Sequence, residues 1–435
     1  MPARFLKRPA AQDAGRSGPD PAVSARVSEI LGEIDRHGLD AVRRYSLELD
    51  DWDPPGGFEV SAPEIERASA ELPESLRTSI AFAQEQIRGF AERQRATLTD
   101  FEAETLPGVF LGQRQVPVSA VGAYCPAGRV PMLACAFMTV LVPKVAGVST
   151  VVACTPPRHG SLHAPTVHAI ATSGADRIYA LGGVQALAAM AFGLLDGEAE
   201  SVDMLVGPGN AFVAEAKRQL FGRVGIDLLA GPSEVAVIAD HTADAELVAA
   251  DLLAQAEHGP TSPATLITTD ERLGALVLEQ VSRQLDGLAH RGADVTPRTA
   301  WNDHGTIVVA DDREHAAMLS DEAAPEHLEV QTDDDDWYLE RLRNYGSLFV
   351  GTRATVAFSD KAIGTNHTLP TGRAARYTGG LSVAKFLKTL TYQRIDTDEG
   401  LSMIAPHVAE ISRADLMPAH EATATKRLER VDHGW

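Results

Sequence analysis

The chain has 435 residues, 44% hydrophobic and 23% charged, a composition that can bury large cores and favours two to four globular domains. Its 39 basic and 60 acidic residues give a formal net charge of −21. This charge argues against a nucleic acid or an anionic membrane as partner, and an anionic substrate would need a local basic pocket.

The N-terminal segment is polar and lacks the apolar core of a signal peptide, and no run of about 18 apolar residues occurs in the chain. The three cysteines form no Cys-x-x-Cys pair, so we expect buried, inert thiols in a reducing compartment. Together these features predict a cytoplasmic protein.

The first part of the chain is predicted to be helical. Apolar residues recur at helical spacing over residues 21–38 and 74–95. The turn-rich segment DDWDPPGGFEV separates the two stretches.

From about residue 116, short β-branched runs alternate with helical segments, which is typical of parallel α/β sheets. The predicted strands of a first array lie at residues 118–124, 148–154, 177–181 and 202–207. Those of a second array lie at 235–240, 264–269, 306–311, 328–332 and 347–351. The similar size of the arrays suggests one architecture used twice, although the residues show no repeat. The chain after about residue 379 is predicted to be helical and too short to bury its own core, so it needs another surface.

A helix predicted at residues 251–260 places Gln255 and His258 on one face, at positions i and i+3. An amide oxygen and an imidazole nitrogen so placed can bind one divalent cation such as Zn²⁺. The alternative is a solvated or capping pair, which is the commoner role of such residues on an amphipathic helix.

Two further motifs suggest a site. Gly207-Pro-Gly209-Asn210 lies between a predicted strand and a helix, where its amides can bind a phosphate or merely form a tight turn. No Gly-x-Gly-x-x-Gly fingerprint opens either array. Glu326 and His327 are adjacent at the start of a predicted strand, and they can serve two proton transfers or simply be exposed polar residues.

Polar residues also gather in a loop at residues 359–370 and near the end of the chain. Loops of this kind commonly carry functional residues. Asp415 and His420 lie on a predicted helical segment that Pro418 interrupts.

Together these stretches resemble the histidinol dehydrogenase family from about residue 20 to 422. The strings that carry the resemblance are GAYCPAGR, KVAGV, LGGVQALAAMAFG, VGPGNAFVAEAKRQ, AGPSEV, DLLAQAEHGP, APEHL, GTNHTLP and a terminal AH. The resemblance implies an α/β fold with two incomplete Rossmann-like parallel-sheet domains and small helical terminal extensions, arranged as an intertwined homodimer.

The domain bounds expected from this resemblance are as follows. Residues 1–20 form an N-terminal extension, and residues 21–121 with 236–378 form the domain that carries the metal and the acid–base residues. Residues 122–235 form the cofactor-binding domain. Residues 379–435 form a helical extension that reaches the partner subunit, so that Asp415 and His420 enter the partner's site.

The resemblance also implies the roles of individual residues. The zinc ligands are Gln255, His258, Asp360 and His420, which also face the substrate. The NAD contacts are Tyr124, Gln185 and Asn210. Further substrate contacts are Ser233, His327, His367 and Asp415. In the implied course His327 removes the hydroxyl proton as hydride leaves for NAD, and Glu326 then activates a water that adds to the aldehyde before a second hydride transfer.

Two positions depart from the pattern of the histidine-biosynthetic enzymes, namely Arg129 and Asp415. In addition, the segment from Asp360 to Gln393 looks like the sulfopropanediol dehydrogenase branch, and it brings Lys361, Arg373 and Arg376 near the predicted metal loop. Such a cationic cluster suits a sulfonate or carboxylate.

We therefore expect a zinc- and NAD-dependent dehydrogenase that oxidises the primary alcohol of a small anionic substrate, such as 2,3-dihydroxypropane-1-sulfonate, to the carboxylate. Arg129 is expected to contact this substrate, the alternatives being cofactor phosphate or an ion pair. The alternative functions are L-histidinol dehydrogenase and an enzyme for another alcohol. A non-catalytic binding protein is disfavoured because every implied ligand and both proton-transfer residues are present.

Overall fold

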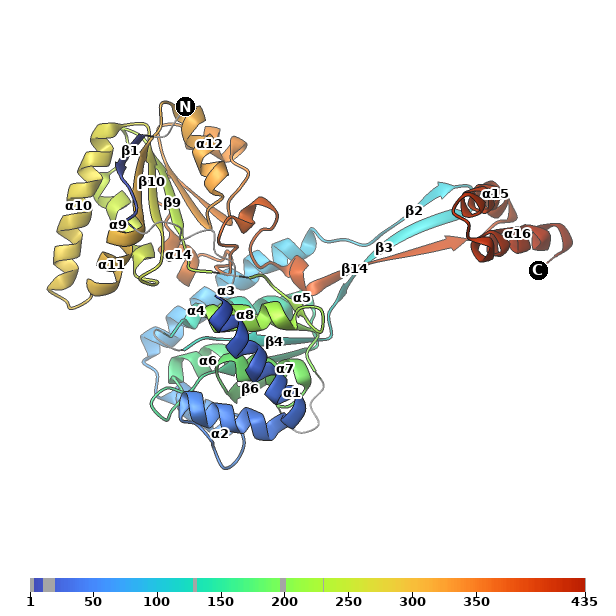
Figure 1. Ribbon diagram of the computed structural model, residues 1–435, viewed down its shortest axis with the longest axis horizontal. Helices are drawn as coiled ribbons and strands as arrows, with labels where there is room; N and C mark the ends of the chain where they lie inside the picture. Colours follow the sequence, from blue (N-terminus) through green and yellow to red (C-terminus); the bar gives the residue numbers. More distant parts are fainter. Residues whose placement is uncertain (1–3, 11–19, 128–130, 196–200, 230, 435) are drawn as a thin grey trace.

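Two α/β domains and a projecting arm make up the molecule (Figure 1). The computed structural model describes the chain except for residues 1–3, 11–19, 128–130, 196–200, 230 and 435. The α/β class with two parallel-sheet domains, expected from the sequence, is confirmed.

A six-stranded sheet forms the core of one domain. Its strands, in spatial order, are β1 (Arg4–Lys7), β11 (Gly305–Val309), β10 (Ala264–Thr268), β9 (Val235–Ala239), β12 (His327–Gln331) and β13 (Ser347–Val350). All neighbours are parallel except β1, which pairs antiparallel at the edge. Without β1, the strands lie in the order third, second, first, fourth and fifth along the chain, which is the Rossmann order.

Helices cover both faces of this sheet because its strand residues alternate between two cores. Val235 and Val237 of β9 face one core, and Ala236 and Ile238 face the other. The helices on the first face are α9 (Ala245–Ala256), α10 (Glu271–Ala289), α11 (Val295–His304) and α14 (Val356–Lys361). Those on the second face are α12 (Arg313–Ala323) and α13 (Asp335–Arg341).

The second domain repeats this strand order in a five-stranded sheet whose strands are all parallel. In spatial order they are β6 (Arg177–Ala180), β5 (Thr150–Thr155), β4 (Ala120–Tyr124), β7 (Met204–Val206) and β8 (Gly225–Ile226). The two domains therefore share one strand order, as the similar size of the two predicted arrays suggested.

The helices of this domain also form two layers. One layer contains α1 (Pro21–Asp50), α7 (Gly183–Phe192) and α8 (Ala211–Leu220). The other contains α2 (Ala62–Ala70), α3 (Glu74–Ala96), α4 (Leu133–Ala136), the π-helix Phe137–Leu141, α5 (Val142–Ala146) and α6 (Ala164–Thr172).

The structure places residues 21–96 with the five-stranded sheet, whereas the expected division put them with the metal-bearing domain. Val27 and Ile34 of α1 pack in one core with Leu187 of α7, and Ile80 and Ile87 of α3 pack in the other core of the same sheet. The apolar faces of these helices are therefore buried in the second domain. The segment Arg4–Lys7 is a strand of the first domain.

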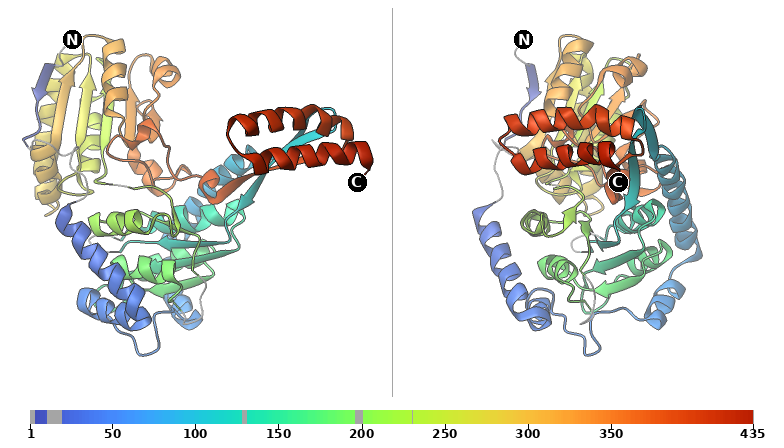
Figure 2. Two further views of the ribbon diagram at one scale, coloured as in Figure 1. Left: turned by 45° about the vertical axis from the view of Figure 1, so that its right-hand side comes forward. Right: turned by 90° about the vertical axis from the view of Figure 1, so that its right-hand side faces the viewer.

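The arm is a three-stranded antiparallel sheet with two helices at its tip (Figure 2). Its strands are β2 (Phe101–Leu106), β3 (Val109–Pro117) and β14 (Leu387–Ile395), and its helices are α15 (Asp398–Ala414) and α16 (Pro418–His433). None of the three strands was predicted from the sequence, and the prediction of helix after about residue 379 is wrong for β14. β2 and most of β14 are exposed on both faces, so no buried apolar face marks them as strands. Pro418 begins α16, a position where proline is tolerated, and so it separates two helices.

No helix in the described part of the chain is long and apolar enough to cross a membrane.

Candidate active site

The predicted acid–base pair lies at the amino edge of the six-stranded sheet. His327 is the first residue of β12 and is paired with Val235, the first residue of β9. The Oε2 atom of Glu326 accepts hydrogen bonds from the Ser233 hydroxyl (2.6 Å) and from the Glu234 backbone N–H (2.9 Å). Glu326 is 5% exposed and His327 is 1% exposed. The pair is therefore enclosed, which excludes the alternative of exposed polar residues.

One ring nitrogen of His327 is occupied and the other is free. Its Nδ1 lies 3.1 Å from the Glu234 carbonyl oxygen, an acceptor that places the proton on Nδ1. Its Nε2 is buried without a hydrogen-bond partner among the described residues and lies 3.9 Å from Asp360 Oδ1. Burial lowers the pKa of His327. At neutral pH the ring is thus uncharged, and the Nε2 lone pair can accept a proton.

Three of the four predicted metal ligands lie beside this base. Gln255 is in the last turn of α9, His258 follows the end of that helix, and Asp360 is in the last turn of α14. His258 Nε2 is 3.3 Å from Asp360 Oδ2, and His258 Nδ1 is 3.5 Å from Gln255 Nε2. The sequence alone linked only Gln255 to His258; the fold adds Asp360 from a helix about a hundred residues away along the chain.

These donors fit a divalent cation. Gln255 is fully buried, yet its Oε1 has no hydrogen-bond partner among the described residues, which is costly for an atom with no ligand to bind. Amide oxygen, imidazole nitrogen and carboxylate together suit Zn²⁺. No group of three or more His, Cys, Asp or Glu side chains that could hold a metal occurs in the described part of the chain. The set at this site contains two side chains of those types, His258 and Asp360, and its third donor is the amide of Gln255.

Burial shifts the ionisation of the carboxyl groups around the site. Burial raises the pKa of Glu326 to about 8, against the opposing effect of its hydrogen bonds from Ser233 and Glu234. Burial and the nearby Glu326 raise the pKa of Glu234 to about 7. For Asp360 burial acts in the same direction, but the hydrogen bond from His258 and the surrounding histidines outweigh it and lower the pKa to about 2. The Asp360 carboxyl group is thus ionised at neutral pH.

The loop after α14 connects the two domains. The Asn366 side-chain amide donates to the Met138 carbonyl oxygen of the π-helix (3.2 Å). His367 is 8% exposed, its Nε2 has no hydrogen-bond partner among the described residues, and burial lowers its pKa to about 4. This predicted substrate contact is therefore a neutral imidazole with a free ring nitrogen.

The three predicted cofactor residues lie at the carboxyl edge of the five-stranded sheet. Tyr124 ends β4, and its hydroxyl accepts a hydrogen bond from the Gly183 backbone N–H at the start of α7 (3.1 Å). Gln185 in the same helix turn donates to Asp50 (2.8 Å), while its buried Oε1 has no partner among the described residues. Asn210 is the N-cap of α8. Carboxyl edges of such sheets are the usual place for nucleotide cofactors.

A buried ion pair that the sequence analysis missed supports the loop before Asn210. Lys217 of α8 pairs with Asp227, and the two side chains are 3% and 0% exposed. Asp227 accepts from the Gly207 N–H (2.8 Å), while Lys217 donates to the Gly207 carbonyl oxygen (3.0 Å). Gly207 has φ of +123°, and an added Cβ would lie 2.2 Å from the Tyr124 carbonyl oxygen. Glycine is therefore needed where this loop meets β4.

The remaining predicted residues are more scattered. Asp415 and His420 are exposed and lie on the arm, at the junction of α15 and α16, away from the other ligands of this chain (Figures 1 and 2). Arg129 lies outside the described residues. Arg373 is exposed and follows Gly372, whose N–H donates to Glu234 (3.0 Å).

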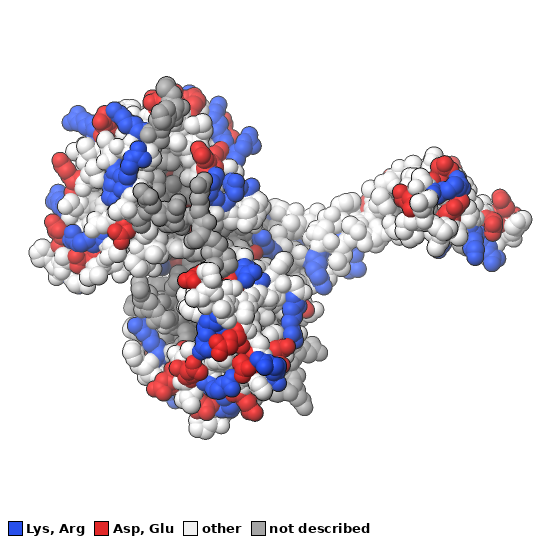
Figure 3. All heavy atoms as spheres, viewed as in Figure 1, with Lys and Arg blue, Asp and Glu red and all other residues white. Residues whose placement is uncertain are grey.

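Lys361 and Arg376 are exposed on the same stretch of chain as Arg373. Over the face shown in Figure 3, basic and acidic side chains are interspersed on both domains. The excess negative charge thus does not gather into one broad patch on that face.

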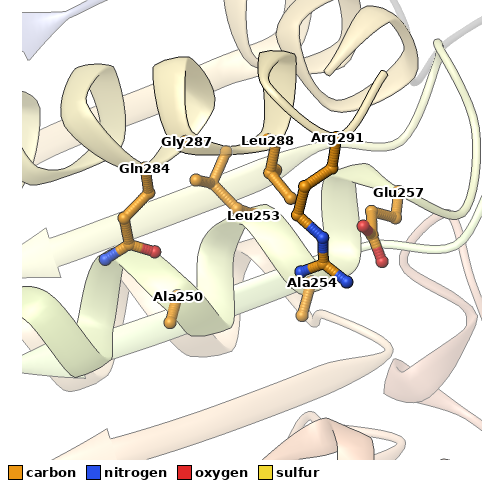
Figure 4. A pocket seen from close by; sticks show the side chains of 8 residues that line it. All are labelled: Ala250, Leu253, Ala254, Glu257, Gln284, Gly287, Leu288 and Arg291. Atoms are coloured by element: carbon orange, nitrogen blue, oxygen red, sulfur yellow. The ribbon is translucent and has the colours of Figure 1, made fainter. Parts of the chain in front are cut away.

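A groove of about 490 Å³ between α9 and the end of α10 is separate from this site (Figure 4). Ala254 of α9 and Glu257, the residue after that helix, line it from one side, and Gln284 and Arg291 line it from the other side. None of the predicted site residues lines the groove.

The chain was compared with known proteins. Residues 16–428 match the sequence profile of the family described as histidinol dehydrogenase. A histidinol dehydrogenase homolog of Shouchella clausii is 52% identical over 94% of this chain and 95% of its own. The sulfopropanediol 3-dehydrogenase of Ruegeria pomeroyi is 47% identical over 94% of this chain and 93% of its own. The crystal structure of histidinol dehydrogenase from Elizabethkingia anophelis is 32% identical and superposes with a TM-score of 0.90, over 97% of this chain and 95% of that one.

The sequence match thus extends over residues 16–428, and the structural match extends over 97% of the chain. The chain therefore belongs to the histidinol dehydrogenase family of NAD-dependent oxidoreductases.

Proposed function

We propose that this protein is a zinc- and NAD-dependent dehydrogenase that oxidises the primary alcohol of a small anionic substrate, similar to 2,3-dihydroxypropane-1-sulfonate, through the aldehyde to the carboxylate. The observation that carries the proposal is the free, buried Nε2 of a neutral His327 beside Asp360. A base in that position can reach a hydroxyl group that is bound at the ligand set.

Gln255, His258 and Asp360 would hold the zinc, with His420 of the partner subunit as fourth ligand. When bound, zinc supplies Lewis-acid polarisation and a fixed orientation for the substrate hydroxyl, and NAD accepts hydride. On the cofactor side, Tyr124, Gln185 and Asn210 would contact NAD.

His327 would take the hydroxyl proton on Nε2 as hydride leaves the substrate carbon. The Glu234 carbonyl oxygen, which accepts from Nδ1, stabilises the imidazolium that forms. Glu326 would take a proton from the water that adds to the aldehyde, and the hydrate then loses the second hydride. One alcohol, one water and two NAD⁺ give one carboxylate, two NADH and three protons.

The preference for an anion is supported by the segment next to the predicted substrate residue Ser233. The backbone N–H of Gly231 donates to the Thr371 hydroxyl (2.5 Å), and Glu234 accepts from Gly372 (3.0 Å). Arg373, which follows Gly372 directly, is exposed and carries a guanidinium group that suits a sulfonate or carboxylate. Arg373 and Lys361 would face the anionic end of the substrate, together with Arg129. The similarity to sulfopropanediol 3-dehydrogenase points the same way.

The second candidate is L-histidinol dehydrogenase, which the similarity to the Elizabethkingia anophelis enzyme favours. The two candidates differ in the charge of the substrate, since histidinol carries a cationic amine. The zinc-loaded protein is assayed for NADH formation with dihydroxypropanesulfonate and with L-histidinol at equal concentration. We expect kcat/KM to be higher for the sulfonate by at least about tenfold, the effect of one charge-assisted hydrogen bond of about 1.5–3 kcal/mol. Preference for histidinol would contradict the anionic substrate and favour the second candidate.

A further inference from the structure

Two neighbouring carboxyl groups, the buried Glu329 and the half-buried Asp251, lie close to the ligand-bearing helices and have no part in the reaction proposed above. Glu329 of β12 is 0% exposed, and it follows His327 by two residues on the same face of the strand. Asp251 of α9 precedes Gln255 by one helical turn on the same face of the helix. The Gln331 side-chain amide donates to both carboxyl groups, to Asp251 Oδ2 (2.9 Å) and to Glu329 Oε2 (3.3 Å).

Asp251 Oδ1 also accepts a hydrogen bond from the Thr355 hydroxyl (2.9 Å). Burial and the nearby Asp251 carboxylate raise the pKa of Glu329 well above its usual range.

The pair also anchors the helix that carries Asp360. Glu329 Oε1 accepts the backbone N–H of Val356, the first residue of α14 (3.0 Å). Thr355, the N-cap residue, directs its hydroxyl to Asp251 and makes no side-chain cap of its own. The start of α14 is thus fixed to both carboxyl groups, and Asp360 lies about one turn further along the helix.

We propose that Glu329 and Asp251 are positioning residues that set the distance between the metal ligands Gln255 and Asp360. They link β12, α9 and α14, which carry the base and two of the ligands. This inference rests on the proposed function, because it concerns the zinc site. Partners that orient ligands in this way typically change metal affinity by about 10- to 100-fold when they are altered.

The test is the zinc dissociation constant, measured on the full-length protein by competition with a chromophoric chelator in the absence of NAD and substrate. In Glu329→Gln the side-chain oxygen can still accept from Val356, so zinc affinity should stay close to that of the unaltered protein. Asp251→Leu leaves the Thr355 hydroxyl and the Gln331 amide without this acceptor, and Glu329→Leu leaves the Val356 N–H without its acceptor. In both Leu variants zinc affinity should therefore fall by about 10- to 100-fold.

Asp240→Leu is the matched control. Asp240 is a buried carboxylate at the opposite end of β9, where it accepts from Thr242 and from the Asp333 N–H. This variant should lower the melting temperature without weakening zinc binding. If Glu329→Leu weakens zinc no more than Asp240→Leu does at equal loss of melting temperature, the positioning role is wrong.

Glu329→Gln provides the second criterion, because it keeps the acceptor for the Val356 N–H that Glu329→Leu removes. Equal losses of zinc affinity in Glu329→Gln and Glu329→Leu would overturn the positioning role. If the unaltered protein takes up no zinc, the proposed function fails, and this inference fails with it. Normal zinc binding that no variant changes would overturn this inference alone.

Discussion

Glu326 and His327 are neighbours in the chain, but the fold gives them different surroundings. The carboxyl group of Glu326 accepts two hydrogen bonds, and burial raises its pKa. The Nε2 atom of His327 has no hydrogen-bond partner among the described residues, and burial lowers the pKa of this ring. Different environments of this kind suit two separate proton transfers.

Substitution of each residue should therefore affect different steps. His327→Asn should slow alcohol and aldehyde oxidation alike, whereas Glu326→Gln should slow mainly aldehyde oxidation, because only that step needs an activated water. The lost general-base effect is worth about 10²- to 10⁴-fold in rate. The measurement is kcat for NADH formation with the alcohol and, separately, with the aldehyde. Equal losses on both substrates in both variants would show that the pair acts as one unit.

At the scale of single elements, helix α8 joins the cofactor loop to α1. Glu215 of α8 is 3% exposed and accepts hydrogen bonds from Arg218 and Gln219 of its own helix and from Ser24 of α1. The Arg218 hydrogen bond, aided by the others, lowers the pKa of Glu215 from 4.5 to about 2. The ionised form is therefore the one that stabilises the fold.

The pH dependence of stability follows from this direction. The stabilisation by Glu215 is complete above its ordinary pKa of 4.5 and is lost as the pH falls toward about 2. Glu215→Gln should lower the urea midpoint at pH 7 and flatten its decline between pH 5 and 3. Urea titrations across that range give the comparison, with the exposed Glu66→Gln as control. An unchanged slope in Glu215→Gln would show that other carboxyl groups account for the acid sensitivity.

For the molecule as a whole, the arm is the feature that a single chain does not explain. It exposes large apolar side chains, among them Leu416 at 87%, Ile411 at 62% and Phe101 at 56%. Its helices have only a small core of their own around Leu401 and Ala405. Apolar surface of this extent marks an interaction site. A partner subunit would cover it and would bring His420 to the ligand set, as proposed.

Mixed dimers test this sharing of sites. His258→Ala and His420→Ala homodimers should each be inactive, because every site lacks one ligand. A heterodimer of the two chains should regain one intact site and about half the activity per dimer, since the two altered ligands would then meet in the other site. Differently tagged chains allow the heterodimer to be purified and assayed. A heterodimer as inactive as its parents would contradict the shared site.

The cytoplasmic location stays a prediction, as does the assignment of individual cofactor contacts.

Much of the fold and part of the site could be predicted from the chain alone. The α/β class, the nine predicted strands of the two arrays and the local pairs Gln255–His258 and Glu326–His327 follow from periodicity and spacing, since both act within a few residues. The other site residues came from the family resemblance, which carries information that spacing does not.

Only the tertiary structure decided where these parts lie. Residues 21–96 pack on the five-stranded sheet, and the exposed strands of the arm form through pairing between segments that are far apart in the chain. In one sheet the site residues lie at the amino edge, and in the other the cofactor residues lie at the carboxyl edge, although both sheets have the same strand order. Asp360 joins His258, and the Gln331 amide joins Glu329 to Asp251, across long gaps in sequence. Such contacts depend on how helices and sheets pack, and helical or strand periodicity specifies only which face is buried, not which partner buries it.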